Sequence, residues 1–378
     1  MKILQYKYSS GSKWVPALSG HAESQLLLIF GSPSLLKDKE PLRELRAAFP
    51  SAIFFGCSTA GEILDTHVTD ETIVVTAIEF EHTHLSTAYS TICSSAESTR
   101  VGEALARSIP HKDLTHLLVL SDGLKINGTE LVQGLTRQLP PGVTVTGGLS
   151  GDGARFGETL VLNEKSEPVP GTVSLIGLYG QRLKVGYASL GGWDPFGPER
   201  IVTRSDGNVL YELDGKSALE LYKQYLGDHA KGLPATGLLF PLSLRTYEGA
   251  TPVVRTILSV DEAQHSMTFA GTMPQGAVTR FMKANFDRLI DGASDAAKAS
   301  CPVSGFKNPC LALLISCVGR KLILKQRIEE EVEGVREVLG ATTKLTGFYS
   351  YGEISPFTPG AKCELHNQTM TITTFSER

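Results

Sequence analysis

The sequence predicts an α/β protein whose mixed β-sheets are built from repeated βαβ units, with an antiparallel meander and helices on the outer faces. Three segments share one layout: an apolar run of strand length, an apolar pattern of helical period, and a second strand run that ends in a Gly/Ser-rich corner. Two strands joined by such a helix are expected to be parallel neighbours. Strand runs broken by Pro/Gly turns separate the second segment from the third. We therefore expect two related lobes, with α-β-β-α layering as one candidate arrangement.

The three repeated segments lie far apart in the chain. The first runs from "SQLLLIFGSP" to "AIFFGCSTAGEI" (24–63), the second from "THLLVLSDGL" to "VTVTGGLSGDG" (115–153), and the third from "CLALLISCVGR" to "TKLTGFYSYGEI" (310–354). In each segment the helical pattern lies between the two strand runs. The repetition predicts that the same βαβ unit occurs three times.

The predicted helices of the second and third units carry start and stop signals. Asn127 can accept hydrogen bonds from the backbone of the first turn, and Glu130 stands where a capping box has its acidic residue. In the third unit one stripe at helical spacing contains Ile328, Val332, Val335 and Leu339. Gly340 is expected to end this helix.

The corners of the first and third units share the pattern G-x-x-[ST]-x-G-E-I, which reads "GCSTAGEI" (56–63) and "GFYSYGEI" (347–354). The second corner, "TGGLSGDG" (146–153), is shorter between its Ser and Gly and contains an Asp. Such a corner presents backbone N–H groups and a hydroxyl at the carboxyl end of a strand, where open α/β sheets bind ligands. In the structural alternative, the glycines only make tight turns and the Ser/Thr side chains satisfy the turn backbone.

The stretch between the second and third units is expected to be rich in β-structure. Residues 158–192 are predicted as an antiparallel meander, and residues 201–213 as a hairpin that turns at Asp206-Gly207. A short helix that ends at Gly227 follows, and residues 278–300 are predicted as one long helix. One side of that long helix would carry Val278, Phe281, Met282, Leu289 and Ala293.

Composition and charge exclude several classes of protein. The net charge of -4 arises from 36 basic and 40 acidic side chains without a basic block, so nucleic acid is not an expected partner. The apolar run "LALLISCV" (311–318) is far shorter than a membrane-spanning helix, and the N-terminus has no apolar signal region. Six cysteines without C-x-x-C spacing indicate reduced thiols. We expect a cytoplasmic protein that does not insert into membranes.

Enzyme signatures are missing from the corners. "GLSGD" and "YSYG" lack a glycine that a nucleophile elbow requires, and no P-loop or H-E-x-x-H motif occurs. A hydrolase with Ser150 or Ser350 as nucleophile and His366 as base stays an alternative. His82 and His84 alternate in a strand-like run, which is more typical of a solvated strand edge than of a metal site. We expect a ligand-binding protein rather than a catalyst.

Several blocks together resemble the FIST domain family and cover nearly the whole chain in family order. They include "GCSTAGEI", "SDGLKINGTELVQGL", "VTGGLSGDGARF", "GTMPQGAVTRFMKANFDRLIDGA" and "GFYSYGEISPF". The resemblance implies an N-terminal FIST domain (1–214) and a C-terminal FIST domain (215–378), with the boundary between Leu213 and Gly215. It also implies an intracellular sensory module for small ligands, with amino acids proposed. Some members bind haem and report nitric oxide to a histidine kinase, so we expect a separate signalling partner, of which a histidine kinase is one candidate.

We expect the corners to line a crevice for a small polar metabolite. Backbone N–H groups and arginine would bind a carboxylate, and Glu or Asp would bind an ammonium group, which suits an amino acid. The candidate ligand-binding residues are Ser58, Thr59, Gly61, Glu62, Ser150, Asp152, Arg155, Trp193, Arg255, Tyr349, Ser350 and Glu353. Trp193 could instead fill a sheet edge, and Arg255 could instead form a structural ion pair. No cofactor or metal is expected; the alternative is haem, with His366 as its ligand.

Overall fold

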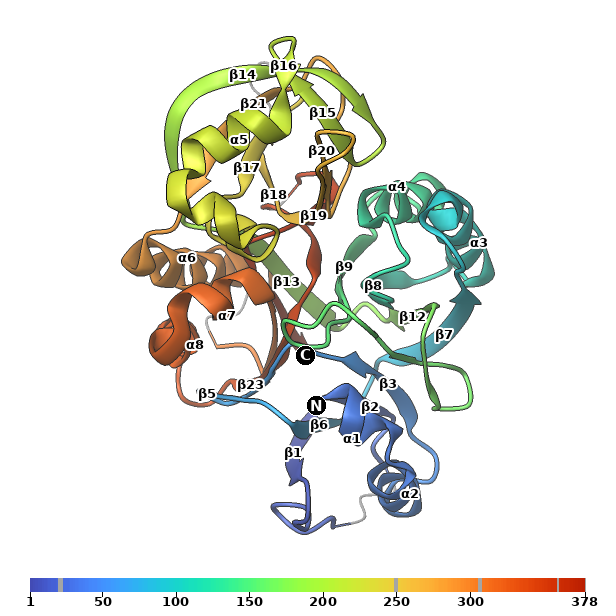
Figure 1. Ribbon diagram of the computed structural model, residues 1–378. Helices are drawn as coiled ribbons and strands as arrows, with labels where there is room; N and C mark the ends of the chain where they lie inside the picture. The colour runs from blue at the N-terminus through green and yellow to red at the C-terminus, as the bar shows by residue number, and fades with distance from the viewer. Residues whose placement is uncertain (20–22, 248–250, 305–307, 359, 378) are drawn as a thin grey trace.

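The structure is a computed structural model that describes residues 1–19, 23–247, 251–304, 308–358 and 360–377. It consists of a body with three six-stranded sheets and a second lobe built on a fourth sheet, called the upper lobe after its place in Figure 1. Helices lie on the outer faces of the body (Figure 1). The predicted α/β class, the repeated units and the two-lobe arrangement are confirmed.

Each sheet of the body has one parallel pair of strands at its centre, which belongs to one repeated unit. The first sheet contains, in order, β1 (Lys2–Ser9), β6 (Thr72–Glu79), β2 (Leu26–Gly31), β3 (Ile53–Ser58), β10 (Val161–Leu162) and β11 (Pro168–Val169). The second contains β25 (Cys363–His366), β24 (Gly352–Pro356), β9 (Thr144–Leu149), β8 (Leu114–Ser121), β12 (Thr172–Tyr179) and β7 (His84–Thr91). The third contains β13 (Leu183–Leu190), β26 (Met370–Glu377), β22 (Leu311–Cys317), β23 (Lys344–Ser350), β4 (Glu62–Leu64) and β5 (His67–Thr69).

The upper lobe is an antiparallel sheet covered by a short helix. Its strands are β18 (Val253–Arg255), β17 (Leu242–Arg245), β21 (Val278–Lys283), β14 (Asp194–Asp206), β15 (Val209–Leu213), β20 (Ser266–Phe269), β19 (Ile257–Asp261) and β16 (Lys216–Ser217). The helices of the protein are α1 (Pro33–Lys37), α2 (Lys39–Ala48), α3 (Ser98–Ser108), α4 (Gly128–Gln138), α5 (Ala218–Leu226), α6 (Phe286–Ser304), α7 (Val318–Leu324) and α8 (Ile328–Leu339).

The predicted cap at Asn127 and the stop at Gly340 are confirmed, whereas Glu130 does not complete a capping box, because the Asn127 N–H donates to Ser98 Oγ. The side chain of Asn127 accepts hydrogen bonds from the backbone N–H groups of Thr129 and Glu130 and so begins α4. Gly340, with a φ of 82°, ends α8. The hairpin β14–β15 pairs Asp206 with Val209, which confirms the predicted tight turn.

The three units exchange hairpins in a cycle. After its corner, each chain segment leaves its own sheet and adds two short strands to a different one. The pair β4–β5 joins the third sheet beside β23, β24–β25 joins the second beside β9, and β10–β11 joins the first beside β3. Each corner therefore carries the chain from one sheet to the next.

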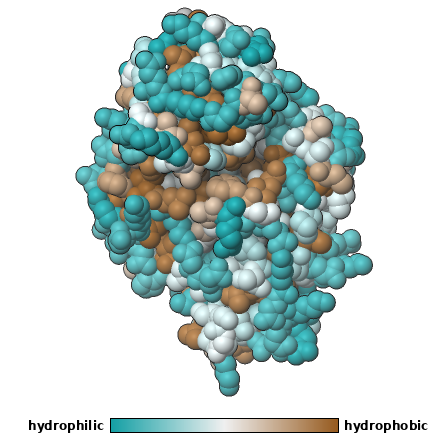
Figure 2. Space-filling model, viewed as in Figure 1, coloured by the Kyte–Doolittle hydropathy of each residue, from teal (hydrophilic) through white to brown (hydrophobic). Residues whose placement is uncertain are grey.

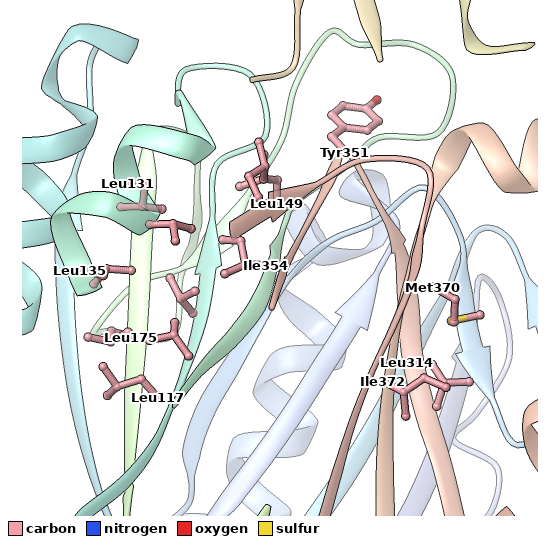
Figure 3. Close-up of a cluster of buried hydrophobic side chains, with 14 of the residues drawn as sticks. Leu117, Leu131, Leu135, Leu149, Leu175, Leu314, Tyr351, Ile354, Met370 and Ile372 are labelled. Atoms are coloured by element: carbon pink, nitrogen blue, oxygen red, sulfur yellow. The ribbon is translucent and has the colours of Figure 1, made fainter. Parts of the chain in front are cut away.

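The body has a central core where the inner faces of the three sheets meet. Leu26, Leu28 and Phe30 of β2 belong to this core, together with alternate residues of β8 and β22. Leu27 and Ile29 of β2 point the opposite way and pack in the cluster that includes residues of α2. Both faces of the central strands are thus buried, which explains their continuous apolar runs. Figure 3 shows the helix side of the second sheet, where leucines of α4 lie over leucines of β8 and β12.

Two sequence expectations for the middle of the chain were wrong in detail. The long helix predicted for residues 278–300 begins only at Phe286, because residues 278–283 form β21 between β14 and β17. Buried Thr279 and Phe281 alternate with more exposed neighbours, so a period of two outweighs the helical pattern there. The strands of the 158–192 stretch do not form one meander, since they join three different sheets.

The predicted boundary at residues 214 and 215 falls in the turn between β15 and β16 of the upper lobe. The third sheet of the body combines β4 and β5 with strands from residues 183–377, so segments from both sides of that position build it. Within the described ranges, none of the helices combines the length and apolarity that crossing a bilayer requires.

Candidate functional site

Each corner begins at a glycine pressed against the neighbouring parallel strand. A Cβ on Gly56, Gly147 or Gly347 would lie only 2.0, 1.9 or 1.8 Å from the carbonyl oxygen of Ile29, Val119 or Leu314, respectively. These carbonyls occupy equivalent positions in the three units. The repeated glycine therefore reflects a close backbone approach, which leaves no room for a side chain.

The three corners meet in space and are joined by backbone hydrogen bonds. The N–H of Ala60 donates to the Tyr349 carbonyl and the N–H of Tyr349 to the Gly61 carbonyl, both at 2.8 Å. The N–H of Gly151 donates to the Ser58 carbonyl at 2.9 Å. The second and third corners are joined by the N–H of Tyr351, which donates to the Leu149 carbonyl at 3.2 Å. We call residues 58–62, 149–152 and 349–353 the corner junction.

The corner junction is buried rather than open. Its hydroxyl groups bond to the protein itself: Ser58 Oγ donates to the Gly151 carbonyl and Ser150 Oγ to the Ser121 carbonyl. Ser58, Ser150, Tyr349, Ser350 and Glu353 have no exposed surface, and Thr59 and Glu62 have almost none. The sequence led us to expect a ligand crevice lined by these residues; in the structure they meet, but they are buried and bond to one another.

Two equivalent carboxyl groups, those of Glu62 and Glu353, connect their corners to neighbouring strands by hydrogen bonds. Glu62 accepts hydrogen bonds from the N–H and hydroxyl of Thr72, and Glu353 accepts them from the N–H and hydroxyl of Thr369. Burial raises the pKa of Glu62 to about 7 and that of Glu353 to about 8, although their hydrogen bonds act in the opposite direction.

Asp152 of the second corner has a different environment. It accepts hydrogen bonds from the N–H groups of Phe156, Gly157 and Glu158, each at 2.9 Å, and from the hydroxyl of Tyr351. Burial alone would raise the pKa of Asp152, but these donors outweigh it and hold the pKa below its ordinary value. Asp152 is therefore a charged anchor for the loop of residues 152–158.

An open pocket of about 420 Å³ lies beside this loop. Its lining residues are Pro33, Ser34, Lys37, Glu71, Asp152, Arg155, Gly157 and Glu158. Lys37 forms an ion pair with Glu158, and Arg155 lies 3.9 Å from Glu71. Two of the predicted ligand residues, Asp152 and Arg155, thus line a pocket that carries charges of both signs.

Trp193 and Arg255 lie away from the corner junction, near the boundary between the upper lobe and the body. The indole N–H of Trp193 donates to the Gln368 carbonyl at 2.8 Å, and its ring packs in a cluster with Met282 and Leu289. Arg255 is 4% exposed and donates from Nη1 to the Leu365 carbonyl at 3.0 Å. Figure 2 shows a hollow with apolar side chains at this boundary.

Comparison with known protein families identifies the chain. Residues 25–216 match the family model of the FIST N domain, and residues 218–356 match that of the FIST C domain. The chain belongs to the FIST family. FIST domains are associated with signal-transduction sensors.

Relatives of this FIST protein occur in bacteria and archaea. Two proteins described as uncharacterized, one from Mycobacterium tuberculosis and one from Mycobacterium bovis, are each 27% identical to it, over 63% and 62% of this chain. A third, from Methanocaldococcus jannaschii, is 23% identical over 82% of this chain. The matches span 63%, 61% and 63% of the three relatives' own lengths.

Two solved structures align with nearly the full length of the FIST protein at low similarity. A chorismatase aligns with a TM-score of 0.37 and 8% identity over 99% of this chain and 98% of its own. A cyanuric acid hydrolase from A. caulinodans aligns with a TM-score of 0.38 and 7% identity over 100% of this chain and 99% of its own.

The surroundings of His366 in the FIST protein do not fit an axial haem ligand. The imidazole is fully buried, its Nε2 is 2.7 Å from the Ser355 carbonyl, and its ring centre lies 4.2 Å from that of Phe357. Burial lowers the pKa of His366 to about 4. Iron could reach this ring only if the surrounding packing opened, and porphyrins need space on both faces of the metal.

The hydrolase alternative requires a hydrogen bond between a corner serine and His366, which the described structure does not contain. Ser350 Oγ donates to Glu353 at 2.7 Å and Ser150 Oγ donates to a carbonyl, so neither hydroxyl bonds to His366. Among the described residues no group of three or more His, Cys, Asp or Glu side chains could hold a metal ion. No disulfide bond joins any of the described cysteines.

Sequence reasoning missed several residues of the open pocket and one of the junction. Ser34 and Lys37 lie in α1, directly after the first strand of the first unit, where the second unit has the loop that carries Asp122. A comparison of these segments, rather than of the corners alone, would have singled them out. Tyr351 is part of the third corner motif, but it contributes by donating a hydrogen bond to Asp152, which belongs to another unit.

Proposed function

We propose that this FIST protein is a cytoplasmic sensor that binds a small zwitterionic metabolite, such as an amino acid, in the open pocket beside the 152–158 loop. One observation carries the proposal: the pocket presents two basic and three acidic side chains, and three of these five belong to a loop that is anchored to the corner junction. Closely spaced charges of both signs match the carboxylate and ammonium groups of an amino acid.

The side chains of the pocket have the chemistry to bind both ends of such a ligand. Arg155 and Lys37 would bind the carboxylate, and Glu71 and Glu158 would bind the ammonium group. In the structure these side chains face each other as ion pairs. The ligand would replace contacts between the residues with contacts to itself, which keeps the net cost of charge desolvation low.

Ligand binding would change the 152–158 loop, because Arg155 and Glu158 belong to it. Asp152 and Tyr351 connect this loop to the corner junction. A ligand can shift such an equilibrium only by binding one state better than the other. A separate signalling protein, for which a histidine kinase is one candidate, would then bind the altered surface, so the chain would act as a sensor and not as a catalyst.

Isothermal titration calorimetry of the purified chain against amino acids and other small metabolites tests the proposal. We expect one or a few zwitterions to bind, and Arg155→Ala to weaken that binding by about tenfold or more, the value of one charge-assisted hydrogen bond. Arg204→Ala is the matched control, because Arg204 is about as exposed and also pairs with a glutamate, but lies in the upper lobe. If no metabolite bound, or if both variants bound equally well, the proposal would be wrong.

A further inference from the structure

We infer that the FIST protein has a second binding site, for a small carboxylate, on the free edge of Arg255 where the upper lobe meets the body. This boundary, which we call the seam, is formed by Arg255–Thr256, Gly271–Thr272, Asn127–Thr129 and the 365–368 segment. The inference goes beyond the proposed function, because none of these residues lines the open pocket.

Arg255 is a buried cation that makes no direct ion pair, and the carboxylate of Glu364 acts on it only from a greater distance. Its guanidinium forms no salt bridge with any carboxylate of the described residues, so the structural ion pair considered from the sequence is not found there. Burial lowers the pKa of Arg255 to about 10, so it still carries its charge at neutral pH. A buried charge that lacks a partner is costly, and the cost is relieved when an anion binds.

One whole edge of the guanidinium is left for a ligand. Nη1 makes both protein hydrogen bonds of Arg255, to the carbonyls of Leu365 and Val254. Nε is buried without a partner, and Nη2 donates to no atom of the described residues. Nε and Nη2 form one edge of the planar guanidinium, and their N–H groups can donate in parallel to the two oxygens of one carboxylate.

Gly271 lies beside this edge. A Cβ on Gly271 would lie only 2.9 Å from Arg255 Nε and 2.8 Å from Thr129 Oγ1, closer than a side-chain carbon normally comes to either atom, so a larger residue there would obstruct both. Thr129 Oγ1 is also buried without a partner. The hydroxyl belongs to the first turn of α4, where the helix dipole favours an anion.

Unpartnered polar atoms concentrate along the seam. Most of the buried side-chain atoms without a partner in the described structure belong to it: Thr129 Oγ1, Arg255 Nε, Thr256 Oγ1, His366 Nδ1, Asn367 Oδ1 and Gln368 Oε1. Native proteins normally satisfy buried polar groups with protein or with a bound molecule. The seam is therefore built for an occupant that is polar.

The chemistry of the seam selects a carboxylate. The guanidinium edge supplies two parallel N–H donors in one plane, and the threonine hydroxyl supplies a third from the body. Because Arg255 belongs to the upper lobe and Thr129 to the body, the bound anion would join the two lobes. The class of ligand is a small molecule with a free carboxylate, for which acetate is the simplest probe.

The test titrates the full chain with sodium acetate, and in a second arm with inorganic phosphate, by calorimetry and thermal unfolding. We expect saturable acetate binding that raises the unfolding temperature. Gly271→Ala should abolish it by placing a methyl group against Arg255 Nε and Thr129 Oγ1, and Thr129→Val should weaken it by about tenfold or more, the value of one hydrogen bond to a charged group. Thr129→Val removes a hydroxyl without a partner, so the folded chain should be at least as stable as before.

The variants distinguish this site from the open pocket. Arg155→Ala should leave acetate binding at the seam unchanged, while Gly271→Ala should leave the metabolite site of the proposed function unchanged. Arg255→Lys keeps the charge but loses the planar guanidinium, and it should bind acetate much more weakly. The inference would be overturned by the absence of saturable acetate binding, by equal binding in Gly271→Ala, or by a preference for phosphate over acetate.

Discussion

Glu62 and Glu353 occupy the same position in two of the three corners, and each accepts two hydrogen bonds from one threonine at the edge of a strand in another sheet. The threonine is Thr72 at the start of β6 for Glu62, and Thr369 just before β26 for Glu353. Both carboxyl groups are buried, and burial raises their pKa values to about 7 and about 8. They are thus the groups through which pH acts on the corner junction.

The stability of the protein is expected to fall as the pH rises from about 6.5 to about 8. Unfolding releases Glu62 and Glu353 to their ordinary pKa of 4.5, so above that pH the unfolded chain is ionised while the folded chain still holds the protons. The free energy of unfolding therefore decreases until the folded-state pKa values are passed. Urea unfolding at several pH values above the ordinary histidine pKa of 6.5 measures this without interference from buried His116 and His366.

The double variant Glu62→Gln/Glu353→Gln is the control for this pH dependence. Glutamine keeps the size of the side chain and an oxygen that can accept hydrogen bonds from the threonines, but it does not titrate. The stability profile of the variant should be nearly flat over the same range. An unchanged slope would show that other groups cause it.

Gly347→Ala is expected to destabilise the fold by about 3 kcal/mol or more, because the new Cβ would lie 1.8 Å from the Leu314 carbonyl oxygen and the packed strands cannot separate easily. Gly142→Ala serves as the comparison. Gly142 also has a positive φ, of 91°, but nothing lies within 4 Å of its added Cβ, so only backbone strain of about 1 kcal/mol should result. Equal losses in chemical denaturation would contradict the steric explanation.

Breaking the buried pair of Arg320 and Glu331 is expected to cost about 3–5 kcal/mol. Neither side chain is exposed, and Glu331 also accepts hydrogen bonds from Tyr349 and Ser316. Arg320→Met would leave an unpaired carboxylate in the core. The double variant Arg320→Met/Glu331→Gln removes both charges and should recover part of the loss, which thermal or urea unfolding of the three proteins would measure. A double variant less stable than Arg320→Met alone would show that hydrogen bonds, and not the charge pair, dominate.

Tyr351→Phe is expected to loosen the 152–158 loop without unfolding the protein. The phenol hydroxyl donates to Asp152, and the ring stacks on Phe156 at a centre distance of 4.4 Å. Loss of the hydroxyl should cost about 1–3 kcal/mol and leave the ring packing intact. Hydrogen exchange of the Phe156, Gly157 and Glu158 amides, which bond to Asp152, should become faster. Amides of β2, far from this loop in the sequence, should exchange as before.

The repeated units could be predicted because their signals are local. The close approach at Gly56 and Gly347 requires the same residue in each copy, and the cap at Asn127 acts on the next turn of its own helix. A period of two or of 3.6 residues is likewise a local property. Residues 278–283 fit both the helical and the strand period, and pairing with β14 determines that they form a strand.

The candidate sites could be predicted only in part, since their residues come from different units. Asp152 and Arg155 were expected to bind ligand, but Lys37 and Glu71 reach the same pocket only through the arrangement of the sheets. Likewise, Thr129 and Gly271 face each other across two lobes. No spacing in the sequence records such contacts, because they depend on how complete sheets pack.

The exchange of hairpins also has a consequence for the order in which the protein can be made. Residues 62–64 form the strand β4, whose neighbour β23 comprises residues 344–350. During synthesis the first corner leaves the ribosome long before its neighbour exists, so the nascent chain carries unpaired strand edges for most of its translation. Contacts between such distant segments are slow to form. The last sheet can close only when synthesis is almost finished, and the molecule is expected to acquire its structure as a whole after translation.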